Sequence, residues 1–148
     1  MGLVYSEITL KNALDVGDCR RGQMREQDVR QTTVKALVDS GAWTLVINEA
    51  VRQKLGLEFV GADYGTLADG AEAIYNLAGP LEVWWKDRRV LCDALVLPDG
   101  QDVLLGAIPL EAMDLIIDPR GEEVVGAHGD VVIHSLKGFT LPAQQASL

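Results

Sequence analysis

The sequence predicts a mainly β fold with one or two short helices, in a single domain spanning residues 1–148. Short segments rich in β-branched and other apolar residues recur along the chain, and turn residues such as Asp-Gly separate them. Apolar residues make up 48% of the sequence, which is enough to fill one core of ordinary size. A chain of 148 residues is not expected to hold a second domain.

The first elements are expected to be two strands joined by a long loop. Residues 3–10 alternate apolar and polar side chains as a half-buried strand does, and residues 32–38 form a β-branched strand. The charged, glycine-containing stretch 15–28 is expected to be an exposed hairpin loop. Residues 45–55 mix apolar and polar side chains and precede Gly56, where a helix would stop, so a short helical turn is expected there.

A hairpin is expected over residues 58–75, with its tip at Ala68, Asp69 and Gly70. The Asp-Gly pair tolerates the positive φ angles that tight two-residue turns require. We interpret this hairpin as a candidate mobile flap.

The later elements are expected to be short. Trp84 and Trp85 are neighbours in one strand, so they face opposite sides and at most one can enter the core. The expected elements are a hairpin of 81–85 with 90–97, a turn at 98–100, a buried strand at 103–105, a helix at 108–113, a strand at 115–117, and a hairpin of 123–125 with 131–133, followed by a polar, frayed tail.

Composition excludes several classes of partner. With 13 basic and 22 acidic side chains the formal charge is −9, which argues against a nucleic-acid surface. No apolar run approaches the length of a membrane helix, and we expect a soluble, cytoplasmic protein without membrane contact. Cys19 and Cys92 are expected to be reduced thiols. His128 and His134 have no Cys or His at metal-ligand spacing, so neither a metal nor another cofactor is expected.

The most informative segment is residues 36–42, Ala-Leu-Val-Asp-Ser-Gly-Ala, in which Asp39 follows an apolar strand. A carboxylate placed there is costly to bury unless it has a function. Asp-Ser-Gly alone is a common turn sequence. A serine-hydrolase role for Ser40 is disfavoured because the Gly-x-Ser-x-Gly pattern is absent.

This segment resembles the active-site loop of the retropepsin-like (clan AA) aspartic proteases, especially the bacterial and archaeal single-domain type, in which two hydrophobic residues precede Asp-Ser/Thr-Gly-Ala. The later order is also similar: a flap hairpin, a second hairpin, then Leu104, Leu105 and Gly106 before a helix. The similarity covers a core of about residues 32–118. The sequence departs from the family in an inserted stretch within 12–31 and in a C-terminal extension, 119–148.

The resemblance implies a closed barrel that forms a two-fold homodimer and acts as a hydrolase, an aspartic endopeptidase on peptide or protein substrates. Its chemistry needs two carboxylates sharing a proton, and the chain contains only one Asp-Ser/Thr-Gly, so Asp39 of each subunit would form the dyad. Ser40 would reach the partner's loop, and Gly41 and Ala42 would complete the loop beside the substrate. The flap residues Ala68, Asp69 and Gly70 would bind substrate amides.

Three questions stay open at this level. The rival interpretation is a catalytically inactive module that keeps the fold for dimerisation or peptide binding. A processing domain of a larger polyprotein is less favoured, because the chain starts at Met1. Trp43 would either narrow a substrate pocket beside Asp39 or pack in the core, and we expect packing.

Overall fold

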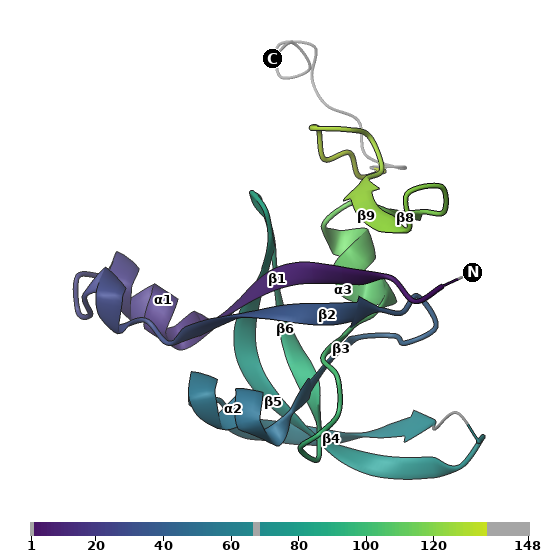
Figure 1. Ribbon diagram of the computed structural model, residues 1–148. Coiled ribbons are helices and arrows are strands. Elements are labelled where there is room, and N and C mark those ends of the chain that lie inside the picture. Colours follow the sequence, from purple (N-terminus) through teal and green to yellow (C-terminus); the bar gives the residue numbers. More distant parts are fainter. Residues whose placement is uncertain (1, 67–68, 136–148) are drawn as a thin grey trace.

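The structure is a computed structural model that describes residues 2–66 and 69–135. It is mainly β, with a few short helices (Figure 1). In chain order the elements are β1 (Tyr5–Asn12), α1 (Ala13–Arg20), the 3-10 helix η1 (Glu26–Asp28), β2 (Gln31–Val38), β3 (Leu45–Asn48), α2 (Glu49–Leu55), β4 (Glu58–Thr66), β5 (Glu72–Trp85), β6 (Arg88–Leu97), β7 (Leu104–Leu105), α3 (Ala107–Ala112), β8 (Leu115–Asp118) and β9 (Glu123–Gly126).

The main sheet has seven strands in the order β1-β2-β7-β3-β6-β5-β4. β1 also pairs with β5, so the strand at one end of this order meets a strand near the other end. Alternation along β1 shows which side is inside: Ile8 and Leu10 are fully buried, whereas Glu7 is exposed. The sheet therefore wraps around one apolar core, to which the central strands contribute Leu45, Ile47, Leu81 and Leu105.

Most of the expected elements are confirmed. The predicted strands at 3–10, 32–38, 103–105 and 115–117 correspond to β1, β2, β7 and β8; the two predicted hairpins are β4–β5 and β5–β6; and the helix predicted at 108–113 is α3. In residues 45–55, β3 comes first and α2 follows. The Asn48 side chain caps α2 by accepting from Val51 N, and Gly56 ends the helix in the left-handed region at φ 63°.

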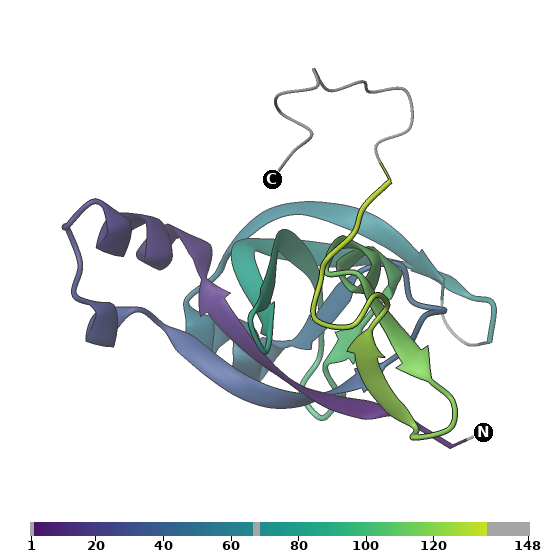
Figure 2. The same cartoon turned by 90° about the horizontal axis from the view of Figure 1, so that it is seen from above.

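The exposed loop expected at 15–28 was wrong over much of its length, because α1 and η1 occupy it. The Asn12 side chain caps α1 by accepting from Asp15 N. Asp15 is buried and accepts three hydrogen bonds from Arg30, through N, Nε and Nη2. This contact between the two ends of the insertion orders a helix that Gly17 would disfavour. In Figures 1 and 2, α1 projects away from the sheet, opposite to the far end of the β4–β5 hairpin.

The expected pairing of 123–125 with 131–133 was also wrong. β9 instead pairs antiparallel with β8, from Leu115 opposite Gly126 to Asp118 opposite Glu123. Residues 131–133 form no strand, and their apolar side chains are exposed. The backbone N–H of Ile133 donates to the Asp114 carboxylate at 3.0 Å. The Asp114 side chain thus accepts the hydrogen bond that the expected partner strand, 123–125, would have accepted. The predicted frayed tail lies outside the described residues.

None of the helices within residues 2–66 and 69–135 has the length and apolar character that crossing a membrane requires.

Candidate active site

Asp39 lies immediately after β2, where two central strands hold the backbone. β7 runs parallel to β2, with Leu37 opposite Leu104 and Val38 opposite Leu105. The N–H of Leu37 donates to Val103 O at 2.8 Å, and the N–H of Asp39 donates to Leu105 O at 3.0 Å. The aspartate is therefore the first residue beyond a paired, buried strand, and its backbone position is determined by the sheet.

The loop turns sharply at Ser40 and Gly41. Gly41 N donates to Asp39 Oδ1 at 2.9 Å, and Ala42 N donates to Asp39 O at 3.1 Å. The Asp39 side chain is half-buried, while Ser40 and Gly41 are exposed. The carboxylate is thus oriented by its own loop and remains accessible from outside.

The segment that begins at Gly106 packs directly against this loop. Ala107 N donates to Ala42 O at 2.7 Å, and Ile108 N donates to Trp43 O at 3.0 Å. A Cβ atom at Gly106 would collide with Thr44 O and lie 2.7 Å from Ala42 O. The predicted Leu104-Leu105-Gly106 segment therefore lies directly against the Asp39 loop, and only glycine fits at its last position.

A cavity of about 770 Å³ opens beside Asp39. The loop after β2, the flap strands β4 and β5, and the end of β6 surround it. Its lining consists of Asp39, Gly41, Ala42, Trp43, Thr44, Val46, Tyr64, Gly65, Thr66, Tyr75, Leu95, Leu97, Gln101 and Leu104. Because Asp39 is the one carboxylate in this lining, a ligand in the cavity would contact an otherwise uncharged wall.

The flap hairpin is present, but its tip is not part of the cavity lining. β4 and β5 pair as far as Thr66 opposite Glu72. Beyond them Gly70 has φ 85°, and Asp69 Oδ1 accepts from Ala71 N at 2.9 Å, as in a tight turn. Ala68, the third predicted flap residue, lies outside the described residues.

Three aromatic side chains of the cavity were missed or misassigned from the sequence. The prediction that Trp43 packs in the core was wrong, because its side chain is 42% exposed and faces the cavity. Tyr64 and Tyr75 come from the two flap strands, and a Cβ atom at Gly65 would lie 2.9 Å from the Tyr75 ring. The glycine therefore leaves room for that ring. The period-two alternation of a strand over residues 72–77, which puts Tyr75 on the same face as Leu77 and opposite to Glu72, is the sequence signal that would have found Tyr75.

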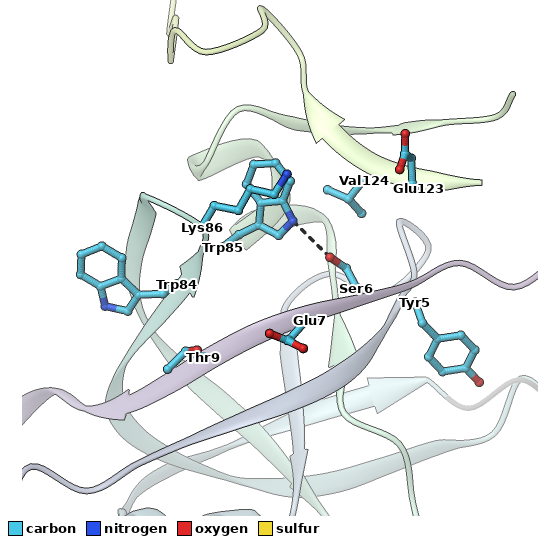
Figure 3. Close-up of a pocket in the computed structure, with 9 residues that line it drawn as sticks. All are labelled: Tyr5, Ser6, Glu7, Thr9, Trp84, Trp85, Lys86, Glu123 and Val124. Atoms are coloured by element: carbon cyan, nitrogen blue, oxygen red, sulfur yellow. Dashed lines mark hydrogen bonds between the residues drawn. The ribbon is translucent and has the colours of Figure 1, made fainter. Parts of the chain in front are cut away.

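A second hollow, of about 460 Å³, lies between β1, β9 and the end of β5, and contains none of the predicted site residues (Figure 3). Trp85 Nε1 donates to Ser6 Oγ at 3.1 Å across it. Figure 3 shows Trp84 pointing in a different direction from Trp85, and only Trp85 is buried, which confirms the prediction for this pair.

Other reactive side chains are not arranged as a site. Within the described ranges, no three His, Cys, Asp or Glu side chains are grouped as metal ligands. His128 Nδ1 instead lies 2.7 Å from Asp114 Oδ2. Both cysteines are free thiols, and burial, with a smaller effect of Asp93, raises the pKa of Cys92 to about 12, which makes it a poor nucleophile.

Comparison with known proteins agrees with this arrangement. Residues 26–107 match the family described as Aspartyl protease. No curated relative matches the chain. Among solved structures, the EIAV protease complexed with the inhibitor HBY-793 is 15% identical, covers 89% of this chain and 94% of its own, and has a TM-score of 0.50. That level of identity shows similarity of fold alone.

Two further structures have lower TM-scores. The retroviral protease-like domain of Ddi1 from Leishmania major is 18% identical, over 81% of this chain and 84% of its own, with a TM-score of 0.48. A retropepsin-like aspartic protease from Rickettsia conorii is 19% identical, over 80% of this chain and 89% of its own, with a TM-score of 0.43.

Proposed function

We propose a peptidase function for this chain, which belongs to the retropepsin-like aspartyl protease family: it is an aspartic endopeptidase in which Asp39 is the catalytic carboxylate. The observation that carries the proposal is the position of Asp39, half-buried in an accessible turn at the edge of the 770 Å³ cavity. An acid held there by Gly41 N, with a substrate-sized space beside it, suits a group that acts on a bound peptide.

The reaction needs a second carboxylate, which a partner subunit would supply. Two carboxylates close together share one proton, because like charges at that distance cannot both ionise. One Asp39 would take a proton from a water molecule, and the other, protonated, would donate a hydrogen bond to the substrate carbonyl. The water oxygen then attacks that carbonyl carbon, and the resulting tetrahedral intermediate collapses as the C–N bond breaks and the leaving amine takes a proton from the dyad. The exposed Ser40 and Ile108 beside the loop support a two-fold contact at this place.

The rest of the fold serves this site in the proposal. The pairing of β1 with both β2 and β5 supports a closed barrel, which would hold the loop rigidly. The flap, including Ala68, Asp69 and Gly70, would bind substrate amides and exclude water when it closes. A cytoplasmic location remains a prediction from the sequence.

The experiment that tests the proposal is peptide-library cleavage by the purified protein from acid to neutral pH, with its oligomeric state measured by analytical ultracentrifugation. Asp39→Asn keeps the side-chain shape and the acceptor for Gly41 N but cannot titrate, so we expect turnover to be lost while the dimer remains. Asp87→Asn, in the exposed β5–β6 turn, is the matched control and should cleave normally. A dimer that cuts no peptide, or an active Asp39→Asn variant, would favour the rival non-catalytic binding module.

A further inference from the structure

Charge is segregated along this chain in a way that the proposed chemistry does not require. The cavity lining comes entirely from three stretches, 36–51, 55–85 and 90–119. None of these stretches contains a lysine, arginine or histidine, although the chain has 13 Lys and Arg in total. Every charged residue within these three stretches is therefore an acid.

Asp63 and Asp102 are each adjacent to a residue of the cavity lining. Asp63 on β4 is directly opposite Tyr75 on β5, so the two side chains share one face of the flap, and Tyr75 lines the cavity. Asp102 follows Gln101, which lines the cavity, and is exposed. Nearby along the chain are three further acids: Asp69 and Asp99 in turns, and Glu72 at the start of β5.

Among residues 2–66 and 69–135, none of these five acids forms an ion pair with a basic side chain. Asp63 Oδ1 accepts from its neighbour Tyr64 N at 2.9 Å, and Asp102 Oδ2 accepts from Tyr5 Oη at 3.4 Å. By contrast, three of the four acids of the α1 insertion are paired: Asp15 with Arg30, Asp18 with Arg21, and Asp28 with Arg25.

The interior of the cavity has the opposite character. Trp43 presents an exposed ring, at 42%, and Val46, Leu95, Leu97 and Leu104 complete an aliphatic wall. Exposed aromatic surface in a concave site is typical of ligand recognition. An uncharged interior within an acidic rim therefore favours a ligand that has both an apolar part and a basic part.

We propose that the substrates of this site are extended polypeptide segments with an apolar or aromatic residue at the cleavage site and lysine or arginine on both sides of it. This inference rests on the proposed peptidase function. The apolar residue fills the cavity against Trp43 and Tyr75, and the flanking basic residues lie near Asp63 and Asp102. A cleft rimmed by one sign of charge also raises the association rate of oppositely charged ligands.

The test uses three peptides with one apolar core, flanked by lysine, by serine or by glutamate. We expect kcat/KM to fall in that order, by about ten-fold from the first to the last at low salt. The difference should shrink as ionic strength rises, because exposed charges are screened. Equal kcat/KM for the three peptides would overturn the proposal.

Matched variants distinguish the effect of the rim acids on peptide preference from the effect of the overall charge. Asp63→Asn with Asp102→Asn removes two rim charges but keeps both oxygen acceptors, and should reduce the lysine preference by about three-fold per acid. Glu7→Gln with Glu26→Gln removes the same charge from β1 and from η1, at the end opposite to the flap, and should keep the preference. A loss of preference in both double variants would overturn the role of the rim.

Binding to the Asp39→Asn protein distinguishes failure of this inference from failure of the proposed function. Fluorescence anisotropy with the same three labelled peptides requires no turnover. Tighter binding of the lysine peptide by a protein that cuts nothing would sustain the inference and reject the peptidase function. Cleavage without any charge preference would do the reverse, and the absence of both binding and cleavage would reject both.

Discussion

Gly106→Ala should displace the Asp39 loop, and the structure gives the size of the displacement. Gly106 has φ −90° and ψ −175°, which any residue adopts, so alanine introduces no backbone strain. Its Cβ would lie 2.7 Å from Ala42 O and 2.8 Å from Thr44 N, whereas ordinary contact begins at 3.4 Å. The difference, 3.4 − 2.7, requires Ala42 O to retreat by about 0.7 Å, and Thr44 O, with which the added Cβ would collide, must retreat further.

Such a shift affects stability and activity together. Overpacking a tight contact costs about 1–3 kcal/mol of unfolding free energy. Because Ala42 is hydrogen-bonded to Asp39 O, the loop moves with it, and a misplacement near 1 Å can cost about 100-fold in rate. We therefore expect a lower urea midpoint and a kcat/KM reduced by at least ten-fold on a peptide that the wild type cuts.

The matched control is Gly17→Ala in α1, where an added Cβ would meet nothing within 4 Å. This substitution should raise the urea midpoint slightly, because alanine favours a helix over glycine by about 1 kcal/mol, and should leave kcat/KM unchanged. If Gly106→Ala matched wild type in both midpoint and kcat/KM, the argument that backbone contact at Gly106 supports the loop would be refuted.

Two further predictions concern buried charges. Arg88 is buried and donates to the carbonyl oxygens of Met113, Asp114 and Gly129, so Arg88→Met should lower the unfolding free energy by about 3 kcal/mol in urea titration; an unchanged midpoint would contradict this role. Hydrogen bonds from the Arg30 side chain lower the pKa of Asp15 below its ordinary value of 3.8. The stability that this ionised carboxylate contributes is present above that value and is lost as pH falls through the lowered pKa. Wild type should therefore lose unfolding free energy more steeply than Asp15→Asn below about pH 4, and parallel pH profiles would argue against the Asp15–Arg30 contact.

Local sequence signals were sufficient for much of the fold. Alternation identifies β1 because one face of that strand is buried and the other is exposed. Asp69 and Gly70 predict the turn between β4 and β5 because Gly70 adopts φ 85° there. The same kind of signal failed for the insertion after β1: the side chains that order α1 are Asn12 and Asp15, and Asp15 is held by Arg30, fifteen positions away.

For the C-terminal strands, too, local sequence signals were not sufficient. Residues 123–125 have the apolar pattern of a strand, but the pattern does not name its partner, and β8 rather than 131–133 provides it. Trp43 illustrates the limit for a single residue. An indole is usually buried, yet the turn after Asp39 directs this one into the cavity.

The sequence by itself determined the parts of the candidate site that a short backbone segment defines: the Asp39-Ser40-Gly41 turn, the Asp-Gly tip of the flap and the glycine at 106. It also determined that every stretch later found around the cavity lacks basic residues. Only the tertiary structure decided that these stretches meet. Pairing of β7 with β2 and the register of β4 with β5 bring Leu104, Tyr75 and Asp63 to one place, because hydrogen bonds between strands join residues that are far apart in the chain.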